Sequence, residues 1–310
     1  MKPKNAQGDL CLESQGPPPF VTRRVHRLDD GTLAVWSARH HRKDLPLPES
    51  LVAGAIRRAC LRSWRLVDDL NWWIGLVFAV GSLLFIFGSV QTLWPGRSVA
   101  AVIDPAYVFF VGSLPFTLAA CLQFYQAANT CDFPLADTVG AQPKTVQQRW
   151  LGCRASELGW WSCLLQLLGT LCFNFSTYQA LHPGPNWFSE DIWVWLPNFV
   201  GSVLFLLSGY MAFAETCHAY WRFLPRNLSW WAVFWNFLGC ISFMLSAFLA
   251  VLVSGTDPVI RLQLSTCFTL LGAVGFFIGS MLLLPEAATE GEKHPPPGEP
   301  PVASLGTLGR

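Results

Sequence analysis

Six apolar segments, each about 20 residues long or longer and almost free of charge, constrain this chain more than any other feature. They lie near residues 70–93, 106–128, 157–180, 194–217, 228–253 and 264–285. At about 1.5 Å per residue, a helix of that length crosses a hydrocarbon core of roughly 30 Å. Only 13% of the residues are charged, which is about half the share usual in soluble domains. The sequence therefore predicts an all-α, polytopic membrane protein with six transmembrane helices.

The six segments pair into three helical hairpins that share one pattern. Each hairpin opens on two adjacent tryptophans, a glycine follows eight residues after the second tryptophan, and a phenylalanine follows four residues later. The second helix of each hairpin repeats the glycine and phenylalanine at the same spacing, and 14 residues past its glycine stands Gln126, Glu215 or Glu286. One pattern at three places predicts an internal repeat that covers both helices.

The repeated glycines and tryptophans have separate expected roles. Small residues let helix backbones approach closely in lipid, so we predict helix-packing positions at Gly81, Gly112, Gly169, Gly201, Gly239 and Gly272. Tryptophan suits the boundary between lipid and water, so we predict interface anchors at Trp72, Trp73, Trp160, Trp161, Trp230 and Trp231. Three residues before each pair, Asp69, Glu157 and Asn227 suit a helix N-cap or first turn.

These segments divide the chain into seven parts. They are a polar N-terminal region at 1–50, an interfacial amphipathic helix at 51–68, repeat 1 at 69–130, a linker at 131–156, repeat 2 at 157–220, repeat 3 at 227–286 and a disordered tail at 287–310. The helix at 51–68 gathers four arginines opposite its apolar face, namely Arg57, Arg58, Arg62 and Arg65. We predict that it lies on the membrane and contacts anionic lipid through them. The alternative is a soluble helix packed on the N-terminal region.

Two features of the polar N-terminal region carry expectations of their own. Residues 30–31, Asp-Gly, are a turn signal between two short runs that tolerate β-structure, which favours a small hairpin. Residues 39–43 read Arg-His-His-Arg-Lys. Because the adjacent histidines lack a third metal ligand, we interpret this tract as a solvated basic patch.

Lysine and arginine are distributed very unevenly around the six segments. The N-terminal region holds 12, the loop 127–156 holds 3, the loop 218–227 holds 2 and the tail after Pro285 holds 2, whereas the other three loops hold only Arg97 and Arg261. This split of 19 against 2 predicts that both termini are cytoplasmic. We expect the protein in the cell (plasma) membrane. A formal net charge of +1 without a concentrated basic surface argues against nucleic-acid binding.

Five polar side chains at costly positions form a candidate polar path: Gln166, Asn198, Asn236, Glu215 and His218. Two interpretations stay open. In the first, the amides hydrogen-bond between helices and Glu215 is an interfacial anchor, like its counterparts Gln126 and Glu286. In the second, all five surround a central path, and the i, i+3 spacing of Glu215 and His218 brings carboxylate and imidazole to one helix face. Pro285 is expected to end the sixth helix.

The sequence lacks the motifs of known chemistries. It has no G-x-S-x-G elbow, phosphate loop, H-E-x-x-H pattern or pair of intramembrane histidines for haem. We therefore expect no enzymatic activity, no cofactor and no metal site, and predict a structural or interaction protein. The alternative is a transporter or channel for ions or small solutes, with a central path between the three hairpins. Three two-helix repeats are similar in plan to mitochondrial carriers, but the carrier signature Pro-x-acid-x-x-base is absent.

The glycine-small-x-x-phenylalanine hairpin with an amide or acid further on resembles the YrhK-like domain, a short membrane domain found mostly in bacteria. The resemblance covers residues 69–286 and rests on Gly112-Ser113 with Phe116, Gly201-Ser202 with Phe205, and Gly272-Ala273 with Phe276. Two departures are the missing amide in the first helix, where the others have Gln166 and Asn236, and Ala273 in place of serine. The family has no assigned activity, so the resemblance implies a membrane protein of three tandem two-helix units.

Overall fold

Six long helices dominate the computed structural model, which describes residues 10–27, 33–45, 59, 62–63, 68–96, 103–130, 152–182, 191–252 and 258–288. They are α3 (Leu70–Leu93), α4 (Pro105–Ala128), α5 (Leu158–Ala180), α7 (Leu196–Cys217), α8 (Leu228–Leu252) and α9 (Pro258–Ala287). A π-helical turn, η2 (Asp191–Trp195), leads into α7. All six helices are long and apolar enough to cross a membrane. The predicted all-α membrane fold with six spans is confirmed.

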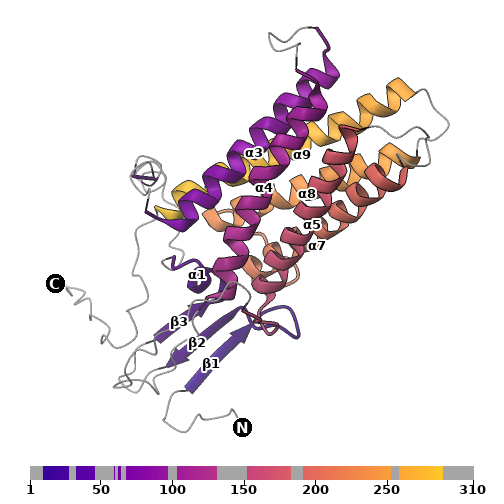
Figure 1. Ribbon diagram of the computed structural model, residues 1–310. Helices are drawn as coiled ribbons and strands as arrows, with labels where there is room; N and C mark the ends of the chain where they lie inside the picture. Colours follow the sequence, from indigo (N-terminus) through magenta and orange to yellow (C-terminus); the bar gives the residue numbers. More distant parts are fainter. Residues whose placement is uncertain are drawn as a thin grey trace.

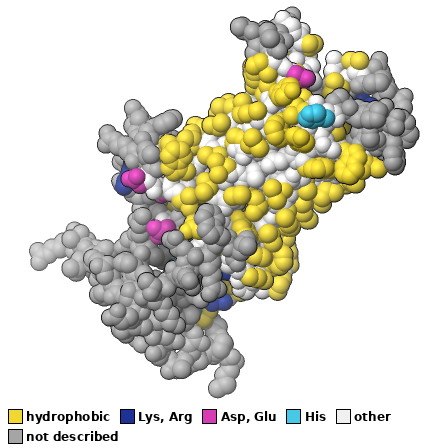
Figure 2. Space-filling view, in the orientation of Figure 1, with side chains coloured by type: hydrophobic (Ala, Val, Ile, Leu, Met, Phe, Trp, Pro, Cys, Tyr) yellow, Lys and Arg dark blue, Asp and Glu magenta, His cyan; other side chains and the backbone are white. Residues whose placement is uncertain are grey.

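The helices form a closed ring in which each contacts two neighbours. Starting from α3, the order around the ring is α4, α5, α7, α8 and α9, and α9 closes the ring against α3 (Figure 1). Hydrophobic side chains cover the flank of the bundle in the view of Figure 2, and the charged side chains visible there gather at its two ends. This distribution matches a lipid-facing belt bounded by two polar surfaces.

Within each hairpin the two helix backbones meet at a pair of glycines. A Cβ atom added to Gly81 would lie 3.1 Å from the carbonyl oxygen of Gly112. The other hairpins repeat this contact at 3.2 Å for Gly169 with Gly201 and at 3.1 Å for Gly239 with Gly272. Because a side chain would force the helices apart, the six glycines of the sequence pattern lie where two helices approach most closely.

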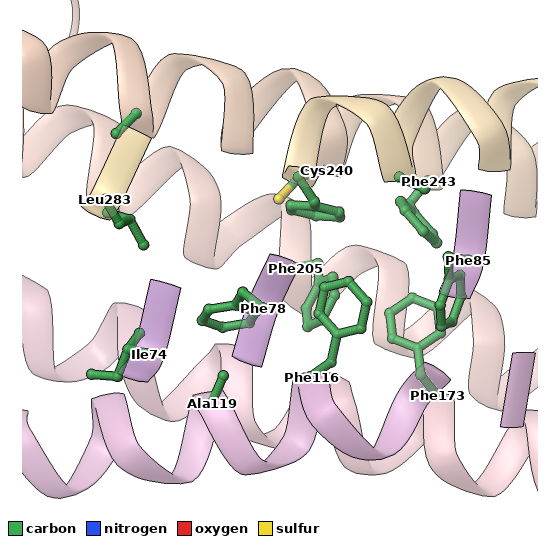
Figure 3. Close-up of a cluster of buried hydrophobic side chains, with 13 residues drawn as sticks. Ile74, Phe78, Phe85, Phe116, Ala119, Phe173, Phe205, Cys240, Phe243 and Leu283 are labelled. Atoms are coloured by element: carbon green, nitrogen blue, oxygen red, sulfur yellow. The ribbon is translucent and has the colours of Figure 1, made fainter. Parts of the chain in front are cut away.

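Six phenylalanine rings, one from each long helix, fill the axis of the bundle (Figure 3): Phe85, Phe116, Phe173, Phe205, Phe243 and Phe276. Neighbouring ring centroids are 4.9–5.9 Å apart, a favourable range for aromatic contacts. With Ser113 and Thr170 they line a cavity of about 10 Å³, which has room for one water at most. Both hydroxyls already donate to backbone carbonyls of their own helices at 2.7 Å. The centre of the bundle is therefore packed and apolar at this depth.

The N-terminal residues form a small sheet that continues into a one-turn helix. Strands β1 (Leu10–Gln15), β2 (Arg23–Arg27) and β3 (Leu33–Ser37) pair antiparallel in that order, and α1 (Ala38–Arg42) follows β3 directly. The hairpin expected around residues 30–31 is thus formed by β2 and β3. We call this sheet with α1 the N-terminal unit. It lies at one end of the bundle (Figure 1), named here the sheet end, where α4, α7 and α9 finish and α3, α5 and α8 begin.

Two helix ends differ from the expectation. Asp69 and Asn227 accept hydrogen bonds from first-turn backbone N–H groups of α3 and α8, as expected of caps. Glu157 makes no such bond, because its carboxylate accepts from Nε of Arg154 at 2.7 Å. Helix α9 does not end at Pro285 but runs through it. A proline in the last turn removes one donor without stopping the helix, so the residue after it stays on the helix.

Candidate functional site

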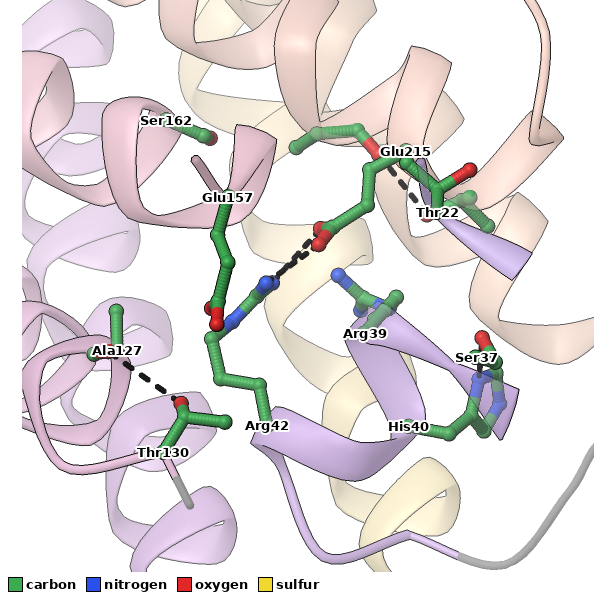
Figure 4. Close-up of polar contacts among 12 residues, drawn as sticks. Thr22, Ser37, Arg39, His40, Arg42, Ala127, Thr130, Glu157, Ser162 and Glu215 are labelled. Carbon is green, nitrogen blue, oxygen red and sulfur yellow. Dashed lines mark hydrogen bonds and ion pairs between the residues drawn. The ribbon is translucent and has the colours of Figure 1, made fainter. Parts of the chain in front are cut away.

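A layer of buried charges lies where α1 meets the sheet end of the bundle (Figure 4). The side chains of Arg39, Arg42 and Lys43 are only 5–7% exposed. His40 is also buried, with Nδ1 3.2 Å from the hydroxyl of Ser37. The interpretation of this tract as a solvated basic patch is therefore wrong. Because α1 follows β3 directly, it lies against the helix ends, where carboxylates offset the free-energy cost of burying its cations.

The first ion pair joins α1 to helix α7. The guanidinium of Arg42 donates two hydrogen bonds to the carboxylate of Glu215, at 2.5 Å and 2.8 Å (Figure 4). The Glu215 side chain is 1% exposed. Gly159, in the first turn of α5, makes the contact sterically possible, because Nη1 of Arg42 occupies the space that a Cβ at this position would need. Two parallel bonds between buried charged groups fix both position and angle of α1.

The second ion pair joins α1 to helix α9. Arg39 donates to both carboxylate oxygens of Glu286, at 3.0 Å and 3.2 Å from Nη2, and Nζ of Lys43 donates to Oε2 at 2.6 Å. The hydroxyl of Ser229, in the first turn of α8, also hydrogen-bonds to this carboxylate. Nε of Arg39 is the fourth donor, at 3.3 Å from Oε1, so Glu286, which is 4% exposed, carries its charge among four donors rather than in water. It is not an interfacial anchor, as the simpler interpretation supposed, and neither is Glu215.

The first hairpin, formed by α3 and α4, contacts α1 through uncharged amide groups. Nε2 of Gln126 donates to Oδ1 of Asn71 at 3.0 Å, and Nδ2 of Asn71 donates to the backbone carbonyl of Lys43 at 2.9 Å. An amide pair thus binds the end of α1, where helical carbonyl groups lack partners.

The three contacts use equivalent positions of the three hairpins. In each hairpin the residue before the tryptophan pair faces the polar residue near the end of the second helix, as in Asn71 with Gln126, Gly159 with Glu215 and Ser229 with Glu286. The bundle therefore offers α1 one neutral and two acidic contacts around a common axis. Arg39 and Lys43 bind Glu286, Arg42 binds Glu215, and the backbone carbonyl of Lys43, the residue after α1, binds the neutral amide pair.

Burial and the neighbouring charges shift the titration of α1. Burial lowers the pKa of His40 to about 4 against the attraction of Glu286, so this imidazole is neutral at pH 7. Burial and the nearby Arg39 lower the pKa of Lys43 to about 8, although Glu286 opposes the shift. Burial also disfavours the charge of Arg42, but the carboxylate of Glu215 outweighs it and raises the pKa of Arg42. The cluster at neutral pH therefore holds three cations against two carboxylates.

His218 takes a partner of its own and does not pair with Glu215. Helix α7 ends at Cys217, and His218 follows in the left-handed region at φ 52°. Its Nδ1 lies 3.0 Å from the hydroxyl of Thr22 in the N-terminal unit. The i, i+3 face expected for the two residues fails because the helix stops between them. Burial lowers the pKa of His218 to about 4, against the attraction of Glu215.

The three amides of the candidate polar path lie outside the central cavity. Gln166, Asn198 and Asn236 are half-buried, and none of them lines the space between the phenylalanine rings. Asn236 lies in the seam between α8 and α9, where its Oδ1 is 2.8 Å from the position of a Cβ on Gly279. Of the five path residues, the structure brings only Glu215 and His218 into the charged layer.

The two tryptophans of each pair differ in burial. The first of each pair is buried, at 7%, 8% and 1% exposure for Trp72, Trp160 and Trp230, whereas the second reaches the surface to a greater degree. In the second and third hairpins both indoles are tied to the preceding loop: Trp160 to Gly152, Trp161 to Ala155, Trp230 to Arg222 and Trp231 to Pro225, at 2.7–3.0 Å. Such bonds satisfy the indole N–H groups without water.

Part of the sequence-based site falls outside the described residues. This applies to Arg57, Arg58 and Arg65 of the expected amphipathic helix, while Arg62 is described and exposed. Within the ranges that the structure describes, no three histidine, cysteine, aspartate or glutamate side chains are grouped so as to hold a metal ion.

Sequence reasoning did not assign Arg39, Arg42 and Lys43 to a site. Their i, i+3, i+4 spacing on one helix turn, together with glutamates at two equivalent helix ends, was the available signal. It was insufficient because the partners are 173 to 247 residues apart, so that only the folded ring brings them together.

Comparison of the chain with protein-family models, with curated proteins and with solved structures finds no match. The resemblance to the YrhK-like domain accordingly stays a prediction.

Proposed function

We propose that the protein is a non-enzymatic membrane scaffold whose six-helix bundle holds the N-terminal unit at the cytoplasmic surface, where the unit binds a protein partner. The observation that carries this proposal is the set of buried ion pairs from Arg42 to Glu215 and from Arg39 and Lys43 to Glu286. In these pairs the carboxylates of Glu215 and Glu286 bind the cations of the N-terminal unit, so they are not free to act in a catalytic site or a transport path. A buried pair fixes orientation well, even where its net contribution to stability is small.

The packed centre supports the same proposal over the transport alternative. A transporter of this plan needs a wetted path near mid-membrane, whereas six phenylalanine rings meet there around about 10 Å³. A conducting state would have to separate several of these rings at once.

Flux measurements test this proposal. The purified full-length protein is reconstituted into liposomes, and uptake of a panel of ions and small metabolites is compared with protein-free liposomes. We expect no difference, also for Glu215→Gln, which weakens docking of the N-terminal unit. Saturable uptake by the wild type that Glu215→Gln abolishes or accelerates would replace the scaffold by a gated transporter.

We also propose that both termini face the cytoplasm of a cell (plasma) membrane protein and that the hairpins are tandem YrhK-like units. The split of 19 basic residues against 2 supports the orientation, and the three equivalent glycine contacts support the repeat. Membrane-impermeant thiol reagents test the orientation in intact cells. They should label an engineered Ser189→Cys and leave Cys131 unlabelled, and the reverse pattern would invert the topology. Anionic lipid contact through Arg57, Arg58, Arg62 and Arg65 belongs to this proposal.

A further inference from the structure

The loop between α7 and α8 presents an aromatic and basic surface that the scaffold role does not use. Three aromatic residues within this loop are largely exposed: Tyr220 at 58%, Trp221 at 61% and Phe223 at 62%. Two arginines beside them, Arg222 and Arg226, are exposed as well. Neither arginine has an ion-pair partner among the described residues. Within seven residues the loop therefore combines large apolar rings with positive charge that no carboxylate of the described residues pairs with.

This loop is held in one conformation by its backbone. The carbonyl oxygen of Arg222 accepts from Nε1 of Trp230 at 2.8 Å and from Sγ of Cys217 at 3.2 Å. The carbonyl of Pro225 accepts from Nε1 of Trp231 at 2.9 Å. Because the carbonyls point to the bundle, the exposed side chains are displayed outward from a fixed support.

The contacts of the aromatic rings place the loop at the edge of the apolar belt. The ring of Trp221 lies 4.9 Å from that of Phe213, which stands one turn inside the apolar span of α7. The ring of Phe223 lies 5.1 Å from that of Trp230, in the first turn of α8. The loop thus folds back along the helix ends instead of projecting from them. Tryptophan and tyrosine at this level are typical of the headgroup region.

We propose that residues 220–226 form a binding surface for an anionic phospholipid of the leaflet at the sheet end. The rings of Trp221 and Phe223 pack against the upper acyl chains, and Arg222 and Arg226 bind the phosphate and the second acidic group of the headgroup. Lipid fits this surface better than a protein partner, because the surface is continuous with the lipid-facing flank of α7 and α8.

The corresponding turn of the second hairpin serves as an internal comparison. The same two indole-to-carbonyl bonds align residues 220–226 with 150–156. In that sequence Trp150 stands at the position of Tyr220, but Leu151 and Cys153 stand at those of Trp221 and Phe223, and Gly152 and Ser156 at those of the two arginines. The arginine of that turn, Arg154, is already paired with Glu157 at 2.7 Å. The turn therefore forms without exposed, unpaired arginines, so the aromatic and basic side chains of the α7–α8 loop are not needed to hold its conformation.

The test is lipid binding to the full-length protein in detergent micelles, measured by native mass spectrometry during titration with dioleoyl phosphatidylserine or dioleoyl phosphatidylcholine. An arginine near an anionic surface contributes roughly a fivefold gain in affinity. The double variant Arg222→Gln, Arg226→Gln should therefore lose roughly 25-fold in phosphatidylserine affinity at unchanged phosphatidylcholine affinity. The double lysine variant should retain the preference, and Arg154→Gln, the matched control, should behave as wild type.

Three results would overturn the proposal. They are an unchanged phosphatidylserine preference in the double glutamine variant, an equal loss in Arg154→Gln, and no preference for phosphatidylserine in the wild type. Should the double variant fail to fold, photoactivatable phosphatidylserine on the wild type decides. Crosslinks must map to residues 218–227, and crosslinks confined to other segments, or equally frequent with phosphatidylcholine, reject the site and leave a protein partner as the occupant to examine.

Discussion

Removing the Glu215 carboxylate should release α1 from the bundle. In Glu215→Gln, the guanidinium of Arg42 stays in a site where its side chain is 7% exposed, but it loses the charge that compensates burial. Breaking a buried ion pair from one side costs about 3–5 kcal/mol. At about 1.4 kcal/mol per factor of ten, docking of the N-terminal unit should weaken by roughly two to almost four orders of magnitude.

Hydrogen exchange of α1 in nanodiscs measures this change. The backbone N–H groups of Lys43 and Leu45 donate to Arg39 at 3.1 Å and to His40 at 2.8 Å, so their protection depends on α1 staying folded and docked. Protection should fall by the factor given above. The helical content of the bundle should not change.

Two comparison variants separate charge from packing. In Glu157→Gln a partly exposed pair is lost, with both side chains 20% exposed, and the cost should stay below about 1 kcal/mol. The double variant Arg42→Met, Glu215→Met removes both buried charges and should recover protection to within about 1 kcal/mol of wild type. If Glu215→Gln exchanges like the wild type, or the double variant is as weakly protected as Glu215→Gln, the ion pair does not dock α1.

Three further perturbations probe the same layer and the core. Gly159→Val fills the space of the Arg42 guanidinium, so α1 protection should drop as far as in the glutamate variant while thiol labelling topology stays unchanged. The pKa of His40 and of His218 is about 4 when docked and about 6.5 when free, so the undocked state binds more protons between these values. Docking should be constant between about pH 6.5 and 8, above which the lowered pKa of Lys43 adds a further gain. It should weaken as the pH falls from 6.5 to 4, by up to roughly 3 kcal/mol per histidine, and intrinsic-rate-corrected exchange that is flat across this lower range would contradict the shift. Phe116→Ala opens a cavity in the central ring cluster and should cost about 3–5 kcal/mol, seen as a lower midpoint of thermal unfolding in detergent, whereas an unchanged midpoint would argue against a packed centre.

The membrane-spanning helices were predictable because lipid imposes a simple rule on sequence. Length and apolarity alone placed all six, and the glycine spacing located the helix contacts at Gly81, Gly169 and Gly239. The extension of α9 through Pro285 was missed, because the sequence does not reveal that a proline in the last turn leaves the remaining bonds intact.

The charged layer was hard to predict because its two halves read as ordinary surface features. Residues 39–43 look like solvated charge, and Glu215 and Glu286 look like helix-end anchors. Their burial follows from a ring that brings α7 and α9 under α1, which is a property of the whole chain and not of any window of it. The spacing of the repeated pattern did predict one property of this layer, namely that Gln126, Glu215 and Glu286 occupy equivalent positions in the three hairpins.

The contact of α9 with α3 also dictates the order of events during synthesis. Arg39 and Glu286 are 247 residues apart, so the ribosome makes α1 before all six long helices and the Glu286 carboxylate only near the end of α9. Until α9 is inserted, one side of α3 lacks its neighbour, and Arg39 and Lys43 lack their acceptor. The usual progression of folding from the N-terminus therefore cannot complete this molecule. The bonds of Arg39 and Lys43 to Glu286 can therefore form only after all six long helices have been made.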